Sequence, residues 1–194
     1  LWNELGDVYR THLSEYDASV ACYDNILLLN IEHEGAIAAL ENLLESGVSV
    51  DVICRALSRV YATQENYDKL ADTLVTLASA VSNSSDKISY YVCAAQIHTE
   101  ILDNVDGSLD CLHKAMACTP AGELVKSMLM EAAQREYTVS ETISEVNEEG
   151  ETVESVVESV GNYWSRVIAI FEDVARGISR EDDAVLATQY AVEL

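Results

Sequence analysis

Apolar residues recur three to four positions apart along almost the whole chain, which is the spacing of one face of an α-helix. Trp2, Leu5, Tyr9 and Leu13 form the first such stripe, and short polar links separate it from the next ones. The pattern predicts about twelve helices of roughly 10 to 18 residues. The expected spans are 1–12, 15–29, 33–46, 49–62, 66–81, 85–102, 106–117, 121–134, 138–147, 151–160, 162–177 and 181–194.

Residues 138–160 fit two structures. Val139, Ile143 and Val146 fall at helical spacing, and Thr138 with Glu141 forms a capping box at the start of a helix. The segment is also rich in β-branched residues, and the Asn-Glu-Glu-Gly sequence within it could form the turn of a β-hairpin. We expect two helices here, with a hairpin as the alternative.

The chain repeats itself weakly at long spacing. A shift of 89 residues places Gly6 on Ala95 and Cys22 on Cys111, and a shift of 96 places the Asn-Tyr pair at 66–67 on the pair at 162–163. The two shifts together indicate a helical unit of about 90 residues that recurs, with an insertion before the second copy ends. Internal repetition at this scale is typical of proteins built from stacked helical units.

Residues 2–31 resemble a tetratricopeptide repeat, a helix–turn–helix unit of roughly 34 residues. The matching positions are Trp2, Leu5, Gly6 and Tyr9 in the first helix and Ser19 and Tyr23 in the second. Ile31 replaces the usual terminal proline, and one extra residue precedes Tyr16. Residues 91–120 match more loosely, through Tyr91, Ala94, Ala95, His98, Ser108, Leu112, Ala115 and Pro120.

The resemblance implies an all-α fold, an α-solenoid of antiparallel helix pairs stacked into a right-handed superhelix. A small residue such as Gly6 or Ala95 permits the second helix of each pair to approach closely. First-helix side chains of such proteins line a concave groove that binds protein partners. The corresponding positions here are Asn3, Asp7, Arg10, Gln96, Thr99 and Glu100. They could equally be solvated helix faces. The basic set with which some members of the family clamp a peptide carboxylate is absent.

The pattern divides the chain into three segments. Residues 1–134 carry the repeat-like helices, 135–161 are an acidic degenerate repeat or insert, and 162–194 are a further helix pair cut short. The chain starts on the first signature residue of a repeat and ends within a predicted helix. We therefore expect a segment of a longer repeat protein.

Acidic residues outnumber basic ones by 34 to 11, which gives a formal net charge of −23. Such a surface repels nucleic acid and anionic membranes, and it favours basic partners or a salty habitat. The five cysteines are scattered singly, which is typical of a reducing compartment and predicts a cytoplasmic protein.

Candidate chemistry is sparse. Cys93, His98, Cys111, His113 and Cys118 could be zinc ligands only if four converged, and their spacing sets them on different helix faces. The acidic segment 103–110 would make a calcium loop with Leu102 and His113 at ligand positions, which neither residue suits. No phosphate-binding loop and no nucleophile motif occurs, so we expect no cofactor and no catalytic site.

These features predict a noncatalytic protein–protein interaction scaffold with a protein or peptide partner. The alternatives are a regulatory or substrate-docking arm of an enzyme whose catalytic domain lies elsewhere, and a metal-binding helical domain.

Overall fold

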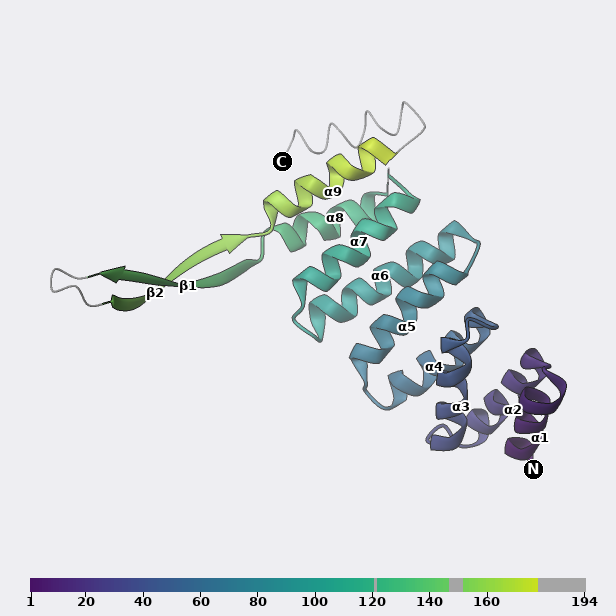
Figure 1. Ribbon diagram of the computed structural model, residues 1–194. Coiled ribbons are helices and arrows are strands. Elements are labelled where there is room, and N and C mark those ends of the chain that lie inside the picture. Colours follow the sequence, from purple (N-terminus) through teal and green to yellow (C-terminus); the bar gives the residue numbers. More distant parts are fainter. Residues whose placement is uncertain (121, 147–151, 178–194) are drawn as a thin grey trace. The chain divides into compact units, whose positions relative to one another are not determined.

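The structure is a computed structural model that describes residues 1–120, 122–146 and 152–177, with side chains left undescribed over 139–146 and 152–158. It divides into two compact units, Leu1–Thr119 and the chain from Pro120 onward. The first unit is helical, as the periodicity predicts, and the second combines two helices with a β-hairpin (Figure 1).

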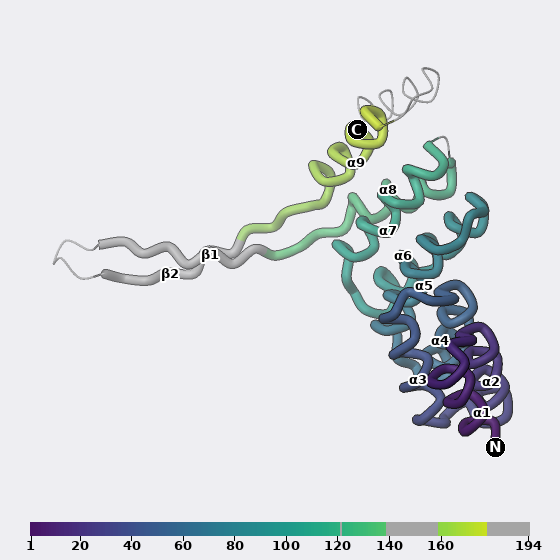
Figure 2. The backbone as a smooth tube through the Cα atoms, turned by 45° about the vertical axis from the view of Figure 1, so that its right-hand side comes forward, coloured from purple at the N-terminus to yellow at the C-terminus, as the bar shows by residue number. Residues whose placement is uncertain are grey.

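The first unit contains seven α-helices and one π-helical turn. They are α1 (Trp2–Val8), η1 (Tyr9–Leu13), α2 (Tyr16–Leu29), α3 (Glu34–Glu45), α4 (Val50–Thr63), α5 (Tyr67–Ala80), α6 (Ser84–Glu100) and α7 (Val105–Cys118). Each helix packs against the next one along the chain (Figure 2). The observed bounds lie within one or two residues of the expected ones, except that the first span is α1 continued by the π turn.

The turns between several helices share one geometry. Ser14, Glu65 and Asp103 each adopt a left-handed backbone, with φ of 54°, 54° and 49°, where one helix ends. The next helix then begins within two residues, and Asn66 and Asn104 cap α5 and α7 with their side chains. A left-handed residue followed by an N-cap reverses the chain over a very short link, which keeps neighbouring helices close.

The α1–α2 crossing depends on the missing side chain of Gly6. A Cβ atom at this position would lie 2.9 Å from Cε1 of Tyr23, and the Tyr23 side chain is fully buried. Ser19 donates a hydrogen bond of 2.9 Å to the carbonyl oxygen of Gly6 across the same crossing. Ala95, which the 89-residue shift aligns with Gly6, is also fully buried. The prediction of small buried residues at both positions is confirmed.

The π-helical turn coincides with the extra residue that the sequence shows before Tyr16. A π turn accommodates one additional residue at the end of a helix without unwinding it. Here η1 carries the insertion, and Ser14 in the left-handed region then ends it. Insertions of this kind often accompany functional sites, and this one borders the surface pocket described below.

The two helix pairs that the 89-residue shift aligns are separated by an odd number of helices. The α1–α2 pair corresponds to the α6–α7 pair, and α3, α4 and α5 lie between them. Three intervening helices cannot be divided into complete pairs, so the helix-pair pattern changes phase within the first unit.

The second unit contains α8 (Glu123–Ala133), β1 (Glu136–Val146), β2 (Thr152–Asn162) and α9 (Trp164–Gly177). The strands form an antiparallel hairpin with a regular register that runs from Glu136 opposite Asn162 to Val146 opposite Thr152. Helices α8 and α9 contact each other, and the hairpin is the connection between them (Figure 2). A short turn could have joined two helices that pack in this way. At the base of the hairpin, the ring centres of Tyr137 and Tyr163 lie 4.8 Å apart.

The helices expected over 138–147 and 151–160 are wrong, since residues 138–146 and 152–160 are strands. Positions four residues apart, such as Val139 and Ile143, satisfy the helical period and also the two-residue period of a strand. The spacing therefore did not discriminate, and the β-branched composition favours the strand. The helix expected over 181–194 lies outside the described residues.

Candidate functional site

The polar face of α1 brings together three of the predicted groove residues. Asp7 is its centre: its Oδ1 accepts a hydrogen bond of 2.7 Å from the Tyr23 hydroxyl and one of 3.2 Å from Arg10 Nη2. Asn3 Nδ2 lies 3.5 Å from the other carboxylate oxygen. Burial of Tyr23, and then its bond to Asp7, raise the pKa of its hydroxyl. Asp7 thus belongs to the packing between α1 and α2 as well as to the surface.

The other three predicted residues lie on α6 and are not equivalent to one another. Gln96 and Glu100 are exposed, four positions apart on one helix face. Thr99 instead donates a hydrogen bond of 2.6 Å to the buried hydroxyl of Ser108 on α7. Its side chain is therefore engaged in the contact between α6 and α7, and Gln96 and Glu100 are the accessible members of this set.

A polar network that sequence reasoning missed joins α3, α4 and α5. One carboxylate oxygen of Glu41 accepts hydrogen bonds of 2.6 Å from the Tyr61 hydroxyl and 2.7 Å from Lys69 Nζ. The Lys69 ammonium also lies 5.3 Å from the centre of the Tyr61 ring, within the range of a cation–π interaction. The bond from Lys69, and then that from Tyr61, lower the pKa of Glu41. Burial is the main cause that raises the pKa of Tyr61.

Two further contacts connect α2 with α4. Ser49 donates a hydrogen bond to Asp17, and Arg59 forms an ion pair with Asp24. Together with the pair between Glu41 and Lys69, they join helices that are separated by one helix in the chain. Such contacts fix the stacking of helices beyond immediate neighbours.

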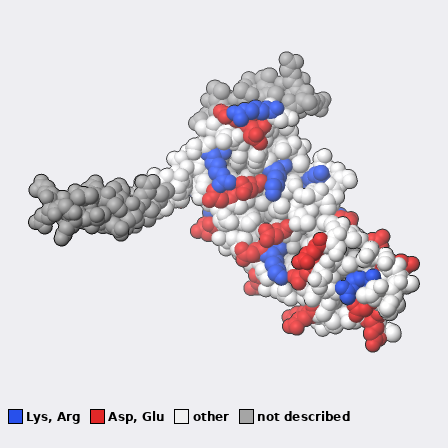
Figure 3. Space-filling view, in the orientation of Figure 1, with Lys and Arg blue, Asp and Glu red and all other residues white. Residues whose placement is uncertain are grey.

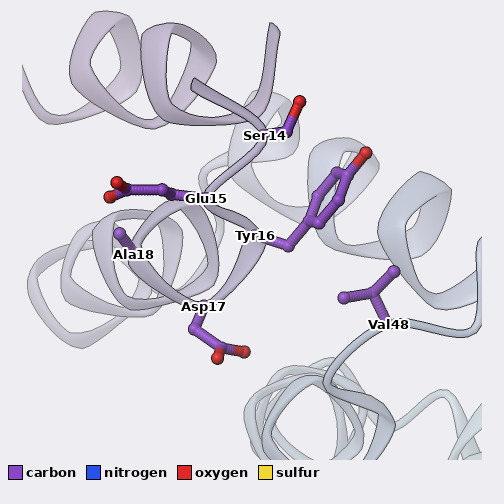
Figure 4. Close-up of a pocket in the computed structure, with 6 residues that line it drawn as sticks. All are labelled: Ser14, Glu15, Tyr16, Asp17, Ala18 and Val48. Carbon is purple, nitrogen blue, oxygen red and sulfur yellow. The ribbon is translucent and has the colours of Figure 1, made fainter. Parts of the chain in front are cut away.

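A surface pocket of about 430 Å³ lies beside the start of α2 (Figure 4). It is lined by Ser14, Glu15, Tyr16, Asp17, Ala18 and Val48. The Tyr16 ring lies on the side of Val48, whereas the Glu15 side chain extends in the opposite direction (Figure 4). The pocket combines an aromatic wall with carboxylates and contains no convergent set of catalytic groups. The signal for it in the sequence is the extra residue before Tyr16.

Two buried cysteines of the first unit, Cys54 and Cys111, are poor candidates for chemistry. Burial raises the pKa of Cys54 and of Cys111 to about 11, so both thiols stay protonated near neutral pH and are poor nucleophiles and ligands. His98 packs against α7, where a Cβ on Gly107 would lie 2.9 Å from its Nδ1. Within the described ranges, no group of three or more His, Cys, Asp and Glu side chains is arranged to hold a metal ion.

Basic side chains are scattered among more numerous acidic ones on the face of the molecule shown in Figure 3. Among the residues that the structure describes, no helix combines the length and the apolarity needed to cross a membrane. Comparison with protein-family models and with curated proteins gives no match to this chain.

Proposed function

We propose that the chain is a noncatalytic protein-interaction scaffold, an α-solenoid of tetratricopeptide-like helix pairs that presents polar first-helix side chains to a protein or peptide partner. The observation that carries the proposal is the recurrence of one crossing at aligned positions. Gly6 and Ala95 are buried in the first helix of each aligned pair, and Ser19 and Ser108 are buried in the second. Both serines make a hydrogen bond to the first helix.

The recurrence supports a modular architecture, because a chain that repeats its helix crossings builds an extended row of helices and a long exposed surface. In such an architecture the accessible polar residues of α1 and α6 are the recognition candidates. They are Asn3, Asp7 and Arg10 on α1 and Gln96 and Glu100 on α6.

The partner we propose is basic. The net charge of −23 produces a negative field that attracts cationic segments and accelerates their association. Two of the five accessible candidates are carboxylates, and only Arg10 is cationic. Binding should therefore weaken as salt is added, because dissolved ions screen the attraction between charges. At physiological ionic strength the screening length is about 8 Å.

The test selects peptides from a random display library against the whole chain and measures their affinity for designed variants. The double variant Asp7→Asn, Glu100→Gln removes two charges and keeps oxygen acceptors, so Tyr23 still has a hydrogen-bond partner. We expect selected peptides to be rich in Lys and Arg and to lose about tenfold or more in affinity for this variant, since rim charges mainly govern attraction.

The matched control is Glu32→Gln with Glu45→Gln, which removes the same charge at exposed positions outside the candidate set. Equal losses for both double variants would show that only net charge matters. Selected peptides that bind the first variant as tightly as the parent chain would refute a role for these residues.

A further inference from the structure

The β1–β2 hairpin has two edges that no described strand covers. Each strand is 11 residues long, and the register between them is regular from end to end. Among the described residues the sheet consists of these two strands alone, and beyond their own pairing they make few contacts with the described helices. On each outer edge, alternate residues direct backbone N–H and C=O groups away from the ladder. An edge of this kind is a template for a further strand.

Packing at the base of the hairpin sets its register. Tyr137 lies opposite Gly161, and a Cβ atom on Gly161 would lie 2.6 Å from Cζ of the tyrosine ring. The ring thus covers the glycine, and it also contacts Tyr163, which precedes α9. Such packing of an aromatic ring on a strand glycine fixes how the two strands pair. Farther from this base, a hairpin of only two strands is marginally stable and gains from a third strand.

The sequence of the two strands does little to block an added strand. Edge strands are commonly protected by short length, lysine, proline or a bulge. Neither strand contains lysine or proline, and the register contains no bulge. Valine, isoleucine and threonine, which favour strands, occupy five positions in each strand, and Val160 is 68% exposed. Glutamate is the one charged residue type present.

The glutamates follow the same pattern in both strands. Residues 141–145 of β1 and 154–158 of β2 both read Glu-x-aliphatic-x-Glu, with Ile143 and Val156 at their centres. Positions two apart lie on the same face of a strand, so the three residues of each pattern share a face. Like charges on adjacent strands are destabilising, and residues 136–165 contain eight glutamates and no Lys, Arg or His. A second copy of the hairpin is therefore a poor third strand, whereas a strand with cations opposite the glutamates is a good one.

The chain itself offers no such strand. Its cations that are four positions apart form two pairs, Arg55 with Arg59 and Arg176 with Arg180. The first pair lies within α4, and Arg176 lies within α9, where it forms an ion pair with Glu172. Neither pair is extended, so these segments do not supply the missing strand.

We propose that the edges of the hairpin bind an extended segment of another protein in which two Lys or Arg residues flank an aliphatic residue at alternate positions. Opposite residues 141–145 or 154–158, this segment sets each cation beside a glutamate and its aliphatic residue beside Ile143 or Val156. Backbone hydrogen bonds supply affinity, and the cross-strand pairs supply specificity. The inference rests on the proposed scaffold function for the basic partner, and it adds a surface separate from α1 and α6.

The test measures binding of a fluorescein-labelled peptide, Thr-Lys-Thr-Val-Thr-Lys-Thr, to the whole chain by fluorescence anisotropy. The matched control peptide, Lys-Thr-Thr-Lys-Thr-Val-Thr, has the same composition but sets its lysines three positions apart, on opposite faces of a strand. We expect saturable binding of the first peptide and at least about tenfold weaker binding of the control, because only the first pairs both cations. Hydrogen exchange of the β1 and β2 amides should slow when the first peptide binds.

Two variants of the chain test the surface. Replacing residues 140–158 with Asn-Gly removes both glutamate patterns and should abolish binding of the first peptide. Replacing the four glutamates of the patterns with Gln keeps the strands and should weaken binding at least about tenfold. The matched control removes the same charge at exposed positions elsewhere and should change the affinity by less than about threefold, since these charges are screened. Its substitutions are Glu32→Gln, Glu45→Gln, Glu65→Gln and Glu131→Gln. Circular dichroism checks that each variant retains its helices.

Three results would overturn the proposal. Equal binding of the two peptides would show that only charge is recognised, and equal binding to the shortened chain would place the site elsewhere. Slow exchange at all amides of β1 and β2 in the chain alone would show that both edges are already covered, by the chain itself or by a second copy that sedimentation detects. None of these results depends on Asp7 or Glu100, so the peptide selection described above tests the scaffold function separately.

Discussion

At the residue scale, several polar groups of the first unit are paired with residues of other helices. Glu41 is an example. It accepts a hydrogen bond from the hydroxyl of Tyr61, a residue that is only 4% exposed, and another from Lys69. These partners lie 20 and 28 positions away in the chain. No local pattern indicates such a pairing, and sequence reasoning therefore could not find it.

Removal of the Glu41 carboxyl should destabilise the chain through Tyr61. Glu41→Ala leaves the buried hydroxyl without its acceptor, and we expect a loss of about 1–3 kcal/mol in the free energy of unfolding. Glu41→Gln keeps an oxygen acceptor and loses the partly exposed ion pair, so its cost should be below about 1 kcal/mol. Urea titration followed by circular dichroism measures both, and equal costs would contradict the role assigned to Tyr61.

The ion pair between Glu41 and Lys69 contributes to the stability of the folded chain in a way that depends on pH. The pKa of Glu41 is lowered in the folded chain, so its stabilising effect is complete above the ordinary value of about 4.5 and disappears as the pH falls through the lowered value. The stability difference between the parent chain and Glu41→Gln should therefore be present at pH 7 and shrink as the pH falls below about 4.5. A difference that stays constant over this range would show that the pairing is not electrostatic.

At the element scale, the helix spans were largely predictable, because apolar periodicity reports directly which face of a helix is buried. Gly6 was predictable for a related reason: a glycine within a helix is costly unless a neighbour needs the space. Tyr23 fills that space here, whereas the 89-residue shift aligns Leu112 with Tyr23 in the helix pair that contains Ala95. The two pairs thus offer alternative solutions to the same crossing.

Substitutions that give the first crossing the residues of the second one test this interpretation. Gly6→Ala should destabilise the chain by about 1–2 kcal/mol, because overpacking against Tyr23 outweighs the helix propensity gained. Adding Tyr23→Leu should recover part of this loss, since it reproduces the Ala95 and Leu112 combination. A double-mutant cycle by chemical denaturation measures the coupling, and strictly additive effects would contradict the contact between the two residues.

The hairpin was the element that the sequence did not settle. A four-residue spacing of apolar positions fits a helix and a strand alike, and the choice depends on pairing with the second strand. The pairing partners are known only from the register, in which Val139 lies opposite Ser159.

Shortening the hairpin should leave the helices intact. Replacing residues 140–158 with Asn-Gly joins Val139 to Ser159 through a two-residue turn and keeps the Tyr137 and Tyr163 contact at the base. An isolated two-stranded hairpin is marginally stable, so we expect helical circular dichroism to be retained and the free energy of unfolding to change by less than about 1 kcal/mol. A large loss of helical signal would mean that the strands support the helices.

At the scale of the whole molecule, the first unit repeats a helix crossing, and the second unit carries a hairpin between two helices. Long-range repetition was visible in the sequence as the shifts of 89 and 96 residues. The change of phase was not, because the three helices between the aligned pairs carry little of the repeat motif. The predicted groove set was likewise only partly informative, since Thr99 contacts Ser108 and Asp7 contacts Tyr23.

The close crossing of α1 and α2 can be tested by a nuclear Overhauser spectrum of the whole chain with protonated Gly and Tyr in a deuterated background. We expect strong cross-peaks between the Gly6 α-protons and the Tyr23 ring protons, because the two residues meet at the α1–α2 crossing. A folded, helical chain without these cross-peaks would contradict the close crossing on which the repeated helix pairs depend.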